Sequence, residues 1–291
     1  MRRKAAGIGA AMAFGLALWS CGGVPAFAQS GPEATPASDS LTQAQRNYMA
    51  SLDRDLAAQD YDKLATSILK PGPSAYLKPA LDWTRDGTLK GRSIIVPLIY
   101  SSLLWNLGVS FPQLPDFKTS SGIIALYALL VAHADGPKCA DPTAPAHRID
   151  VITRDDRKQF ETIAALPAKK RHDALAAAIR LERSTAKLRT DDKYLCRFGM
   201  QETLAILRQH QGEKLKEKKP ESAFTGIKIE KKAESAFAGL EIQLPADAPY
   251  MPSFLPYDQW ASKQAAIRAT FPAMLTAFIA KFKPQAAQHA H

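Results

Sequence analysis

Apolar residues recur at intervals of three and four positions through most of residues 42–212, which is the spacing of one face of an α-helix. The first such stretch begins at Thr42, where Gln45 completes a capping box. It ends at residues 70–73, where two prolines and a glycine favour a turn. This first part of the chain therefore predicts a helical hairpin.

The most apolar run of the chain, residues 123–132, predicts a central buried helix, because no face of it is polar. We expect Ser120 or Ser121 to cap its start, and the Asp-Gly-Pro sequence at 135–137 to stop it. The run is too short to cross a bilayer.

Further helical patterns lie on both sides of this run. Pro79 and Pro97 each suit the first turn of a helix, where a missing N–H group removes no hydrogen bond. Residues 137–152 predict a proline-bearing loop that holds Cys139. The remaining helices are expected at 79–86, 97–108, 155–166, 168–189 and 191–212.

A short tandem repeat follows a charged run at residues 213–220. The segments 218–230 and 231–243 match at eight of their thirteen positions, and apolar and polar residues alternate near the end of each copy. This alternation predicts a β-hairpin or paired extended arms within 213–245. Such an arm suits docking on a partner, and a duplicated surface flap is the alternative.

The C-terminal part carries apolar residues at helical spacing on both sides of Pro272. This spacing predicts a pair of helices or one kinked helix within 246–284, packed on the core and followed by a disordered tail at 285–291. Together, these patterns predict a mainly α fold. It is a single globular helical domain of roughly seven to nine helices, with a short hairpin or arm insertion and one disulfide.

The N-terminus has the layout of a secretory signal peptide. Three basic residues at positions 2–4 precede an uncharged, mostly apolar run, and Ala26-Phe27-Ala28 offers small residues where a signal peptidase cleaves. We expect cleavage after Ala28, a periplasmic or secreted protein, and a flexible lead-in at 29–41. Alternatively, the sequence around Cys21 resembles a bacterial lipobox, and lipidation there would anchor the protein to a membrane.

Two cysteines remain once the signal peptide is removed, Cys139 and Cys196. An even pair in an exported protein predicts a disulfide, because the space outside the cytoplasm is oxidising. Closing this span would contribute about 4 kcal/mol in the chain-entropy model. A free catalytic thiol is the alternative, and it would need surroundings that stabilise a thiolate.

Composition and charge narrow the classes of function. With 46% hydrophobic and 23% charged residues among 291, the chain is neither a disordered polyelectrolyte nor collagen-like. Removing residues 1–28 takes away three positive and no negative charges, so the net charge falls from +10 to +7. We expect an envelope protein or an anionic cell-surface component as partner, and a membrane only if Cys21 is lipidated. No basic run is interleaved with aromatic residues, so we expect no nucleic-acid binding.

A cluster of residues that can bind metal ions lies within 133–147. Its members are His133, Asp135, Cys139, Asp141 and His147. Imidazole and carboxylate groups suit zinc or another divalent ion, so a metal-dependent hydrolase or metal-binding protein using this loop is one hypothesis. Because we assign Cys139 to a disulfide and His133 to a helix end, we predict no metal site and no cofactor.

Two Ser-x-x-Lys matches, at Ser67/Lys70 and Ser184/Lys187, carry the nucleophile and base of penicillin-binding enzymes. Neither is followed by the Ser-x-Asn and Lys-Thr-Gly elements that this chemistry also needs. We therefore name no catalytic residue. The first hypothesis is an exported, non-catalytic protein that binds or supports another envelope component.

Overall fold

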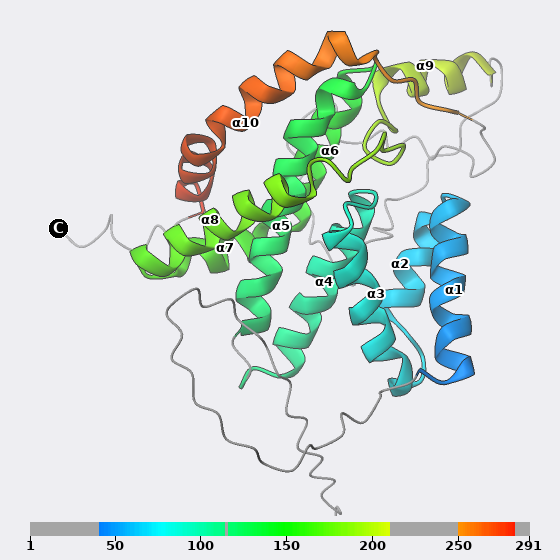
Figure 1. Cartoon of the computed structure of the whole chain (residues 1–291), viewed down its shortest axis with the longest axis vertical. Coiled ribbons are helices and arrows are strands. Elements are labelled where there is room, and N and C mark those ends of the chain that lie inside the picture. Colours follow the sequence, from blue (N-terminus) through cyan, green and yellow to red (C-terminus); the bar gives the residue numbers. More distant parts are fainter. Residues whose placement is uncertain (1–40, 114–115, 210–249, 283–291) are drawn as a thin grey trace, which may run out of the picture. The chain divides into compact units, whose positions relative to one another are not determined.

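The computed structural model describes residues 41–113, 116–209 and 250–282, and these form a mainly helical fold (Figure 1). Ten α-helices lie in these ranges, one more than the predicted upper figure, together with the short 3-10 helices η1 Ser74–Tyr76 and η2 Gly136–Lys138. In chain order the α-helices are α1 Gln43–Ala57, α2 Tyr61–Leu69, α3 Leu77–Leu89, α4 Ile95–Ser110, α5 Asp116–Asp135, α6 Thr143–Asp155, α7 Arg157–Ala165, α8 Ala168–Thr185, α9 Met200–Gln209 and α10 Tyr257–Ala280. The predicted signal peptide, the hairpin at 213–245 and the tail at 285–291 lie outside the described residues.

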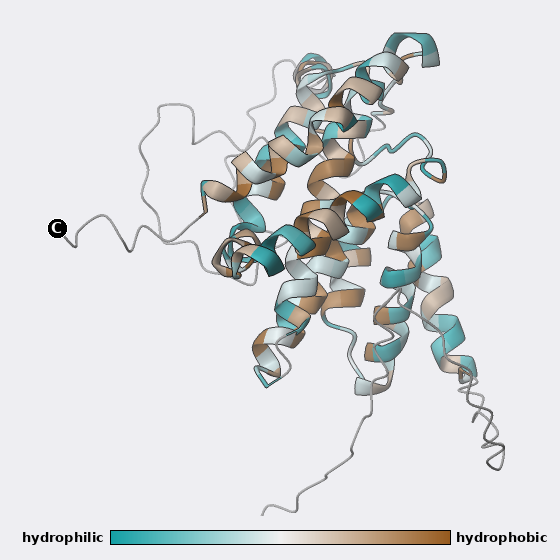
Figure 2. Ribbon diagram, turned by 60° about the vertical axis from the view of Figure 1, so that its left-hand side comes forward, coloured by the Kyte–Doolittle hydropathy of each residue, from teal (hydrophilic) through white to brown (hydrophobic). Residues whose placement is uncertain are grey.

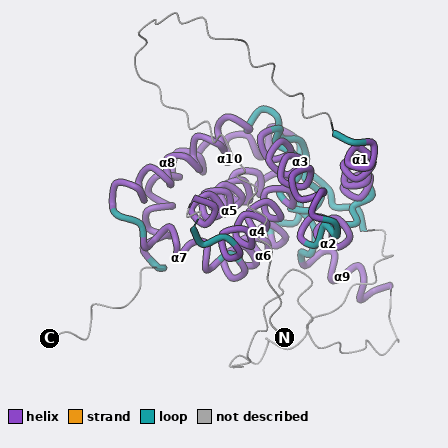
Figure 3. Tube along the Cα trace, turned by 90° about the horizontal axis from the view of Figure 1, so that it is seen from below, coloured by secondary structure: helices purple, strands orange, loops and turns teal. Residues whose placement is uncertain are grey.

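Helix α5 is the central helix, as predicted (Figure 3). It packs against α4, α6, α7, α8 and α10, while α1, α2 and α3 complete the other side of α4. Leu126, Tyr127 and Leu130 on α5 are almost completely buried. Figure 2 shows hydrophobic residues gathered where the helices face one another and hydrophilic residues on the outward faces.

Small residues allow α4 and α5 to pack closely. The Ser101 hydroxyl donates to the Ser121 carbonyl at 3.0 Å, and the Ser121 hydroxyl donates to the Ser101 carbonyl at 2.8 Å. On the next residue of α5, a Cβ added at Gly122 would lie 2.6 Å from the Ile163 side chain. The absence of a side chain there therefore lets α7 approach α5.

One helix in the described part of the chain is long and apolar enough to cross a membrane by length and composition. It is α5 with the following η2 turn, Asp116–Lys138. Because 61% of its apolar window is buried inside the fold, we describe it as a core helix. The predicted helix at 123–132 covers only part of α5, which begins at Asp116.

The predicted start of α5 was wrong. Helix α5 begins at Asp116, so Ser120 and Ser121 lie within it and do not cap it. An acidic residue in the first turn interacts favourably with the helix dipole. The Ser121 hydroxyl is satisfied by the neighbouring helix α4, a tertiary contact that local sequence does not reveal.

The predicted loop at 137–152 was also wrong, because α6 begins within it at Thr143. Pro145 lies in the first turn of α6, where helices tolerate proline because the first N–H groups have no partner within the helix. The Asp141 carboxylate caps this turn by accepting from the Thr143 N–H group at 2.9 Å. Two prolines at the start of a helix were mistaken for a loop signal.

The predicted helix at 191–212 was wrong in its first part. Residues 186–199 form an irregular connection, which we call the 186–199 segment, and α9 begins only at Met200. The Asp192 side chain accepts hydrogen bonds from the N–H groups of Tyr194 and Leu195, which competes with helix formation. Phe198 has a positive φ of 66°, a conformation that a helix does not contain.

The disulfide between Cys139 and Cys196 is present, with 5.3 Å between the two Cα atoms. Both cysteines are buried. Since Cys196 lies in the 186–199 segment, the disulfide joins that segment, and not a helix, to the end of η2. Cys139 also pairs with Phe254 in an isolated β-bridge, so the entry to α10 meets the disulfide at the same place.

The C-terminal part, for which the sequence predicted either a pair of helices or one kinked helix, forms the single helix α10. It is one helix that continues through Pro272, and it packs against α5, α7 and α8. The buried residues Phe271, Leu275 and Ile279 supply this contact. The Thr276 hydroxyl donates to the Pro272 carbonyl at 2.8 Å.

Candidate functional site

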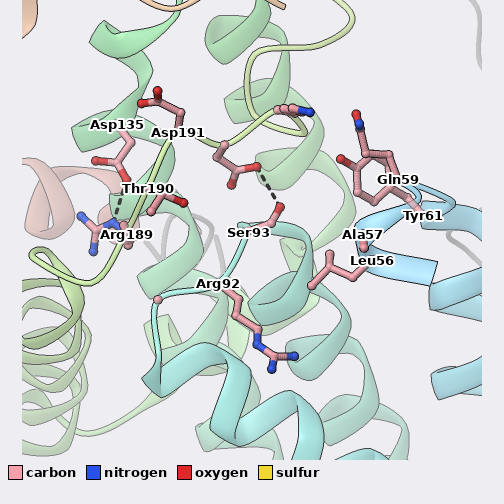
Figure 4. A pocket seen from close by; sticks show the side chains of 13 residues that line it. Leu56, Ala57, Gln59, Tyr61, Arg92, Ser93, Asp135, Arg189, Thr190 and Asp191 are labelled. Carbon is pink, nitrogen blue, oxygen red and sulfur yellow. Dashed lines mark hydrogen bonds and ion pairs between the residues drawn. The ribbon is translucent and has the colours of Figure 1, made fainter. Parts of the chain in front are cut away.

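A cavity lies where three connections meet the C-terminal end of α5 (Figure 4). It has a volume of about 200 Å³. The α1–α2 turn, the α3–α4 turn, the C-terminal end of α5 and the 186–199 segment surround it. Its lining residues are Leu56, Ala57, Gln59, Tyr61, Gly91, Arg92, Ser93, Asp135, Arg189, Thr190, Asp191, Asp192 and Lys193.

Asp192 on the wall of this cavity caps helix α4 from a distant part of the chain. Its carboxylate accepts from the Ile94 N–H group at 2.5 Å and from the Ser93 hydroxyl at 2.8 Å. Helix α4 has no side-chain cap within its own sequence, so Asp192 supplies the negative charge that a helix N-terminus favours. Burial raises the pKa of Asp192, and the hydrogen bonds from Ile94 and Ser93 act against that rise.

Arg189 forms the buried floor of the cavity and joins two carboxylates. Its Nε atom lies 2.7 Å from Asp135 Oδ2, and its Nη2 atom lies 2.5 Å from Glu182 Oε1. A Cβ added at Gly91 would lie 2.9 Å from the Arg189 side chain, so the α3–α4 turn needs glycine there. Burial acts to lower the pKa of Arg189, but the two carboxylates outweigh it and raise that pKa.

The same cluster extends to α10 and η2. Gln264 Nε2 donates to Asp135 Oδ1 at 2.7 Å, and Arg268 Nε lies 3.0 Å from Glu182 Oε1. Lys138 Nζ lies 3.4 Å from Asp135 Oδ1 and 5.1 Å from the centre of the Trp260 ring. Buried charges are tolerated when they are paired and hydrogen-bonded. In this cluster, every charged group has an ion-pair partner, and among the described residues Glu182 Oε2 and Arg268 Nη2 are its buried atoms without a hydrogen bond.

A second buried cation stabilises the other half of the 186–199 segment. Arg148 on α6 donates to the Tyr194 hydroxyl at 2.8 Å and to its carbonyl at 3.2 Å. Its guanidinium carbon also lies 3.7 Å from the centre of the Tyr194 ring and 5.4 Å from that of Phe198. These contacts fix the chain between the cavity and the disulfide.

The groups that remain available to a ligand in the cavity are few. In the described part of the chain, the side chains of Gln59, Asp191 and Lys193 form no hydrogen bond or ion pair. Tyr61 packs edge-on against Tyr194, and burial followed by the nearby Asp192 raises the pKa of its hydroxyl. Ligand pockets usually have volumes of about 300–1,000 Å³, so this cavity suits only a small polar species. The charged residues Asp135, Arg189 and Asp192, which line it, already form ion pairs or hydrogen bonds within the protein.

The residues of the alternative metal-site hypothesis, within 133–147, are not arranged around a common centre. Asp135 binds Arg189 and Gln264, and Cys139 is in the disulfide. Burial lowers the pKa of His133, and burial together with Arg148 lowers that of His147. Within residues 41–113, 116–209 and 250–282, no group of three His, Cys, Asp or Glu side chains is arranged to hold a metal ion.

Asp141, the remaining member of that cluster, caps two helices at once. It accepts from the N–H group of Thr143 on α6 and, at 2.8 Å, from that of Gln201 on α9. Burial acts to raise the pKa of Asp141, but these hydrogen bonds and one from the Thr143 hydroxyl outweigh it and lower the pKa. A Cβ at Gly199 would lie 2.3 Å from the Asp141 carboxylate, so only glycine allows this arrangement.

The Ser-x-x-Lys match on α8 does not form a nucleophile and base pair. The Ser184 hydroxyl is exposed and donates to the Leu181 carbonyl of its own helix at 2.9 Å. Sequence reasoning missed Asp192, Arg189 and Arg148, which organise this end of the molecule. The polar run at 189–193, placed between two helical patterns, was the available signal.

Exposed apolar side chains gather around the start of α9. Phe198, Met200, Leu204 and Met251 are between 40% and 58% exposed, and we call them the α9 surface. Met251 belongs to this group because the carbonyl of Ser253, two residues later, accepts from the Ala140 N–H group at 3.0 Å, next to Asp141, which caps α9. Large apolar side chains that remain exposed together are typical of interaction sites.

Comparisons with protein families, with curated proteins and with solved structures find no match to this chain.

Proposed function

We propose that this protein is an exported, non-catalytic binding protein that docks on another envelope component through the α9 surface. The observation that carries the proposal is the exposure of Phe198, Met200, Leu204 and Met251 next to the disulfide. Methionine and aromatic side chains are enriched in protein interfaces. Methionine also adapts to irregular partner surfaces because its side chain is unbranched and flexible.

The support beneath the α9 surface is rigid. Asp141 hydrogen-bonds Gln201, the Thr143 hydroxyl accepts from the Met200 N–H group at 2.7 Å, and Arg197 pairs with Glu202 at 2.5 Å. These contacts fix the first turn of α9 on α6 and the disulfide. A surface held in place before binding loses little conformational entropy when a partner docks.

The tandem repeat also bears on this proposal through its position in the sequence. Helix α9 ends at Gln209, and Tyr250 is the next residue that the structure describes. In sequence, the repeat at 218–243 therefore lies between Leu204 and Met251 of the α9 surface. The repeat itself lies outside the described residues. Deleting 218–245 tests whether it contributes to the same contact.

The location in the envelope is part of the proposal and has its own test. The N-terminal sequence pattern supports export, and the disulfide is compatible with an oxidising compartment. Intact mass of the protein from its producing cells should correspond to a chain that begins at Gln29. A chain that begins at an acylated Cys21 would establish the lipid-anchored alternative, and an uncleaved N-terminus would contradict export.

The docking proposal is tested with paired variants. The surface variant carries Met200→Gln and Leu204→Gln, and the control variant carries Leu89→Gln and Val109→Gln, two equally exposed apolar positions elsewhere. Each protein is cross-linked in the intact envelope of the producing cells, purified, and its co-purifying proteins are quantified by mass spectrometry. Thermal unfolding of each purified protein checks that the fold is kept.

We expect the surface variant to lose at least one wild-type partner about tenfold or more, because central apolar contacts dominate binding energy. The control variant should retain that partner. Equal partner profiles for the two variants would contradict docking at the α9 surface.

A further inference from the structure

Four cations line up along the outward face of α8. They are Lys169, Arg180, Arg183 and, just beyond the helix end, Lys187, and we call them the α8 stripe. Their separations are close to multiples of the helical repeat, so they fall on one side of the helix. All four are exposed, while the opposite face of α8 buries residues such as Leu175 and Ile179 in the core.

The charges of the α8 stripe are not neutralised by the fold. In the described part of the chain, none of the four forms an ion pair, whereas Arg85, Arg92, Arg154 and Arg157 each pair with a carboxylate on another part of the surface. The acidic residue Asp173 lies on the same side of α8 and contacts His172 at 3.6 Å. The stripe therefore presents a net positive charge to solvent.

We propose that the α8 stripe binds the anionic headgroups of a phospholipid surface. Helix α8 has 18 residues, which corresponds to a rod roughly 27 Å long. Cations near both ends of such a rod, Lys169 at one end and Arg180, Arg183 and Lys187 at the other, can contact the same flat anionic layer. Leu188, directly after Lys187, is 55% exposed and can enter the boundary between headgroups and acyl chains.

A lipid surface fits this stripe better than an acidic protein does. A protein interface needs a packed apolar centre. Within residues 168–190, Leu188 is the one large apolar side chain that is exposed. Binding to a fluid headgroup layer needs only charge and a shallow apolar contact. This inference does not depend on the α9 surface, because the two features lie on different helices.

The test measures binding of the purified protein to vesicles. All proteins carry Cys21→Ser, so that no acyl chain contributes to binding. Sedimentation compares vesicles of phosphatidylcholine alone with vesicles in which about one third of the lipid is the anionic phosphatidylglycerol. The stripe variant carries Lys169→Gln, Arg180→Gln, Arg183→Gln and Lys187→Gln. The control variant loses the same charge at Lys90→Gln, Lys158→Gln, Lys263→Gln and Lys281→Gln.

We expect wild-type and control proteins to bind the anionic vesicles, with binding that weakens as salt is raised. Each stripe cation contributes roughly fivefold to the partition coefficient, so the stripe variant should bind at least about 100-fold more weakly. Equal weakening in both variants, or equal binding to neutral vesicles, would overturn the proposal. Binding to soluble polyglutamate but not to anionic vesicles would assign the stripe to an acidic polymer instead and would also overturn it.

Discussion

Two buried regions of this protein differ in what holds them together. The α4–α5 pair is packed with aliphatic side chains, whereas the 186–199 segment is fixed by Arg189, Asp192, Arg148 and one disulfide. Apolar packing has no fixed direction and tolerates small shifts. A buried charge, in contrast, needs a particular partner at a particular distance. The regions should therefore respond differently to substitution.

The largest effect should come from removing the cation that serves two carboxylates. Arg189→Met keeps much of the side-chain volume but leaves Asp135 and Glu182 buried without their shared partner. We expect a loss of about 3–5 kcal/mol in the free energy of unfolding, measured by urea denaturation. The matched change Arg183→Met, at an exposed position on the preceding helix α8, should have little effect. A loss below about 1 kcal/mol for Arg189→Met would show that the 186–199 segment does not depend on its buried charges.

The disulfide should have the next largest effect. Replacing both cysteines, Cys139→Ser with Cys196→Ser, removes the cross-link between η2 and the 186–199 segment. We expect a loss of about 2–4 kcal/mol, observed as a lower urea midpoint in the variant. Reduction of the wild-type protein under denaturing conditions should reproduce the same midpoint on refolding. A variant as stable as the oxidised wild type would show that the cross-link is dispensable.

A buried carboxyl without a cationic partner should destabilise the fold when it is charged, unlike the carboxylates paired with Arg189. Asp156, between α6 and α7, accepts from Gln159 Nε2 at 3.0 Å, and burial followed by the charge of Asp155 raises its pKa to about 8. Between about pH 4 and pH 8 the unfolded chain has released a proton that the folded chain still holds. Stability therefore falls as pH rises through this window.

The change Asp156→Asn removes this titration while keeping an acceptor for Gln159. We expect the variant to be more stable than wild type by about 1–3 kcal/mol at pH 8 and similar to it at pH 4. Urea denaturation across this pH range measures the difference. Parallel stability curves for the two proteins would contradict the assignment of a raised pKa to Asp156.

The smallest effect should come from the α4–α5 pair. Ser101→Ala removes the hydroxyl that donates to the Ser121 carbonyl, and the reciprocal bond from Ser121 to the Ser101 carbonyl remains. We expect a loss of about 1 kcal/mol in the free energy of unfolding, because apolar packing continues to hold the helices together. A loss as large as that of Arg189→Met would remove the contrast between the two regions.

The same contrast explains what could be predicted from the sequence. Regular apolar spacing indicated α1, α2, α4, α7 and the buried helix α5, because hydrophobic burial leaves a periodic pattern. The capping box of Thr42 and Gln45 is also present. The cysteine pair was predicted from the residue count and the expected compartment, and it forms.

The 186–199 segment and the cavity could not be predicted in this way. Asp192 caps α4, and its partner Ile94 is almost a hundred positions away in the sequence. Asp141 likewise connects the starts of α6 and α9. Such contacts depend on which polar groups the fold brings together, and no local spacing encodes them. For the same reason, Asp135, Cys139 and Asp141, which are close in sequence within 133–147, are directed to separate partners.

The most direct test of the proposed function is site-specific photo-cross-linking in living cells. A photoreactive amino acid is placed at Met200 on the α9 surface or, as the matched position, at the equally exposed Val109 on α4. We expect a cross-link to one envelope protein from position 200 that is absent from position 109 and is reduced by Leu204→Gln. Identical cross-linking from the two positions, or none from position 200, would contradict the proposed docking.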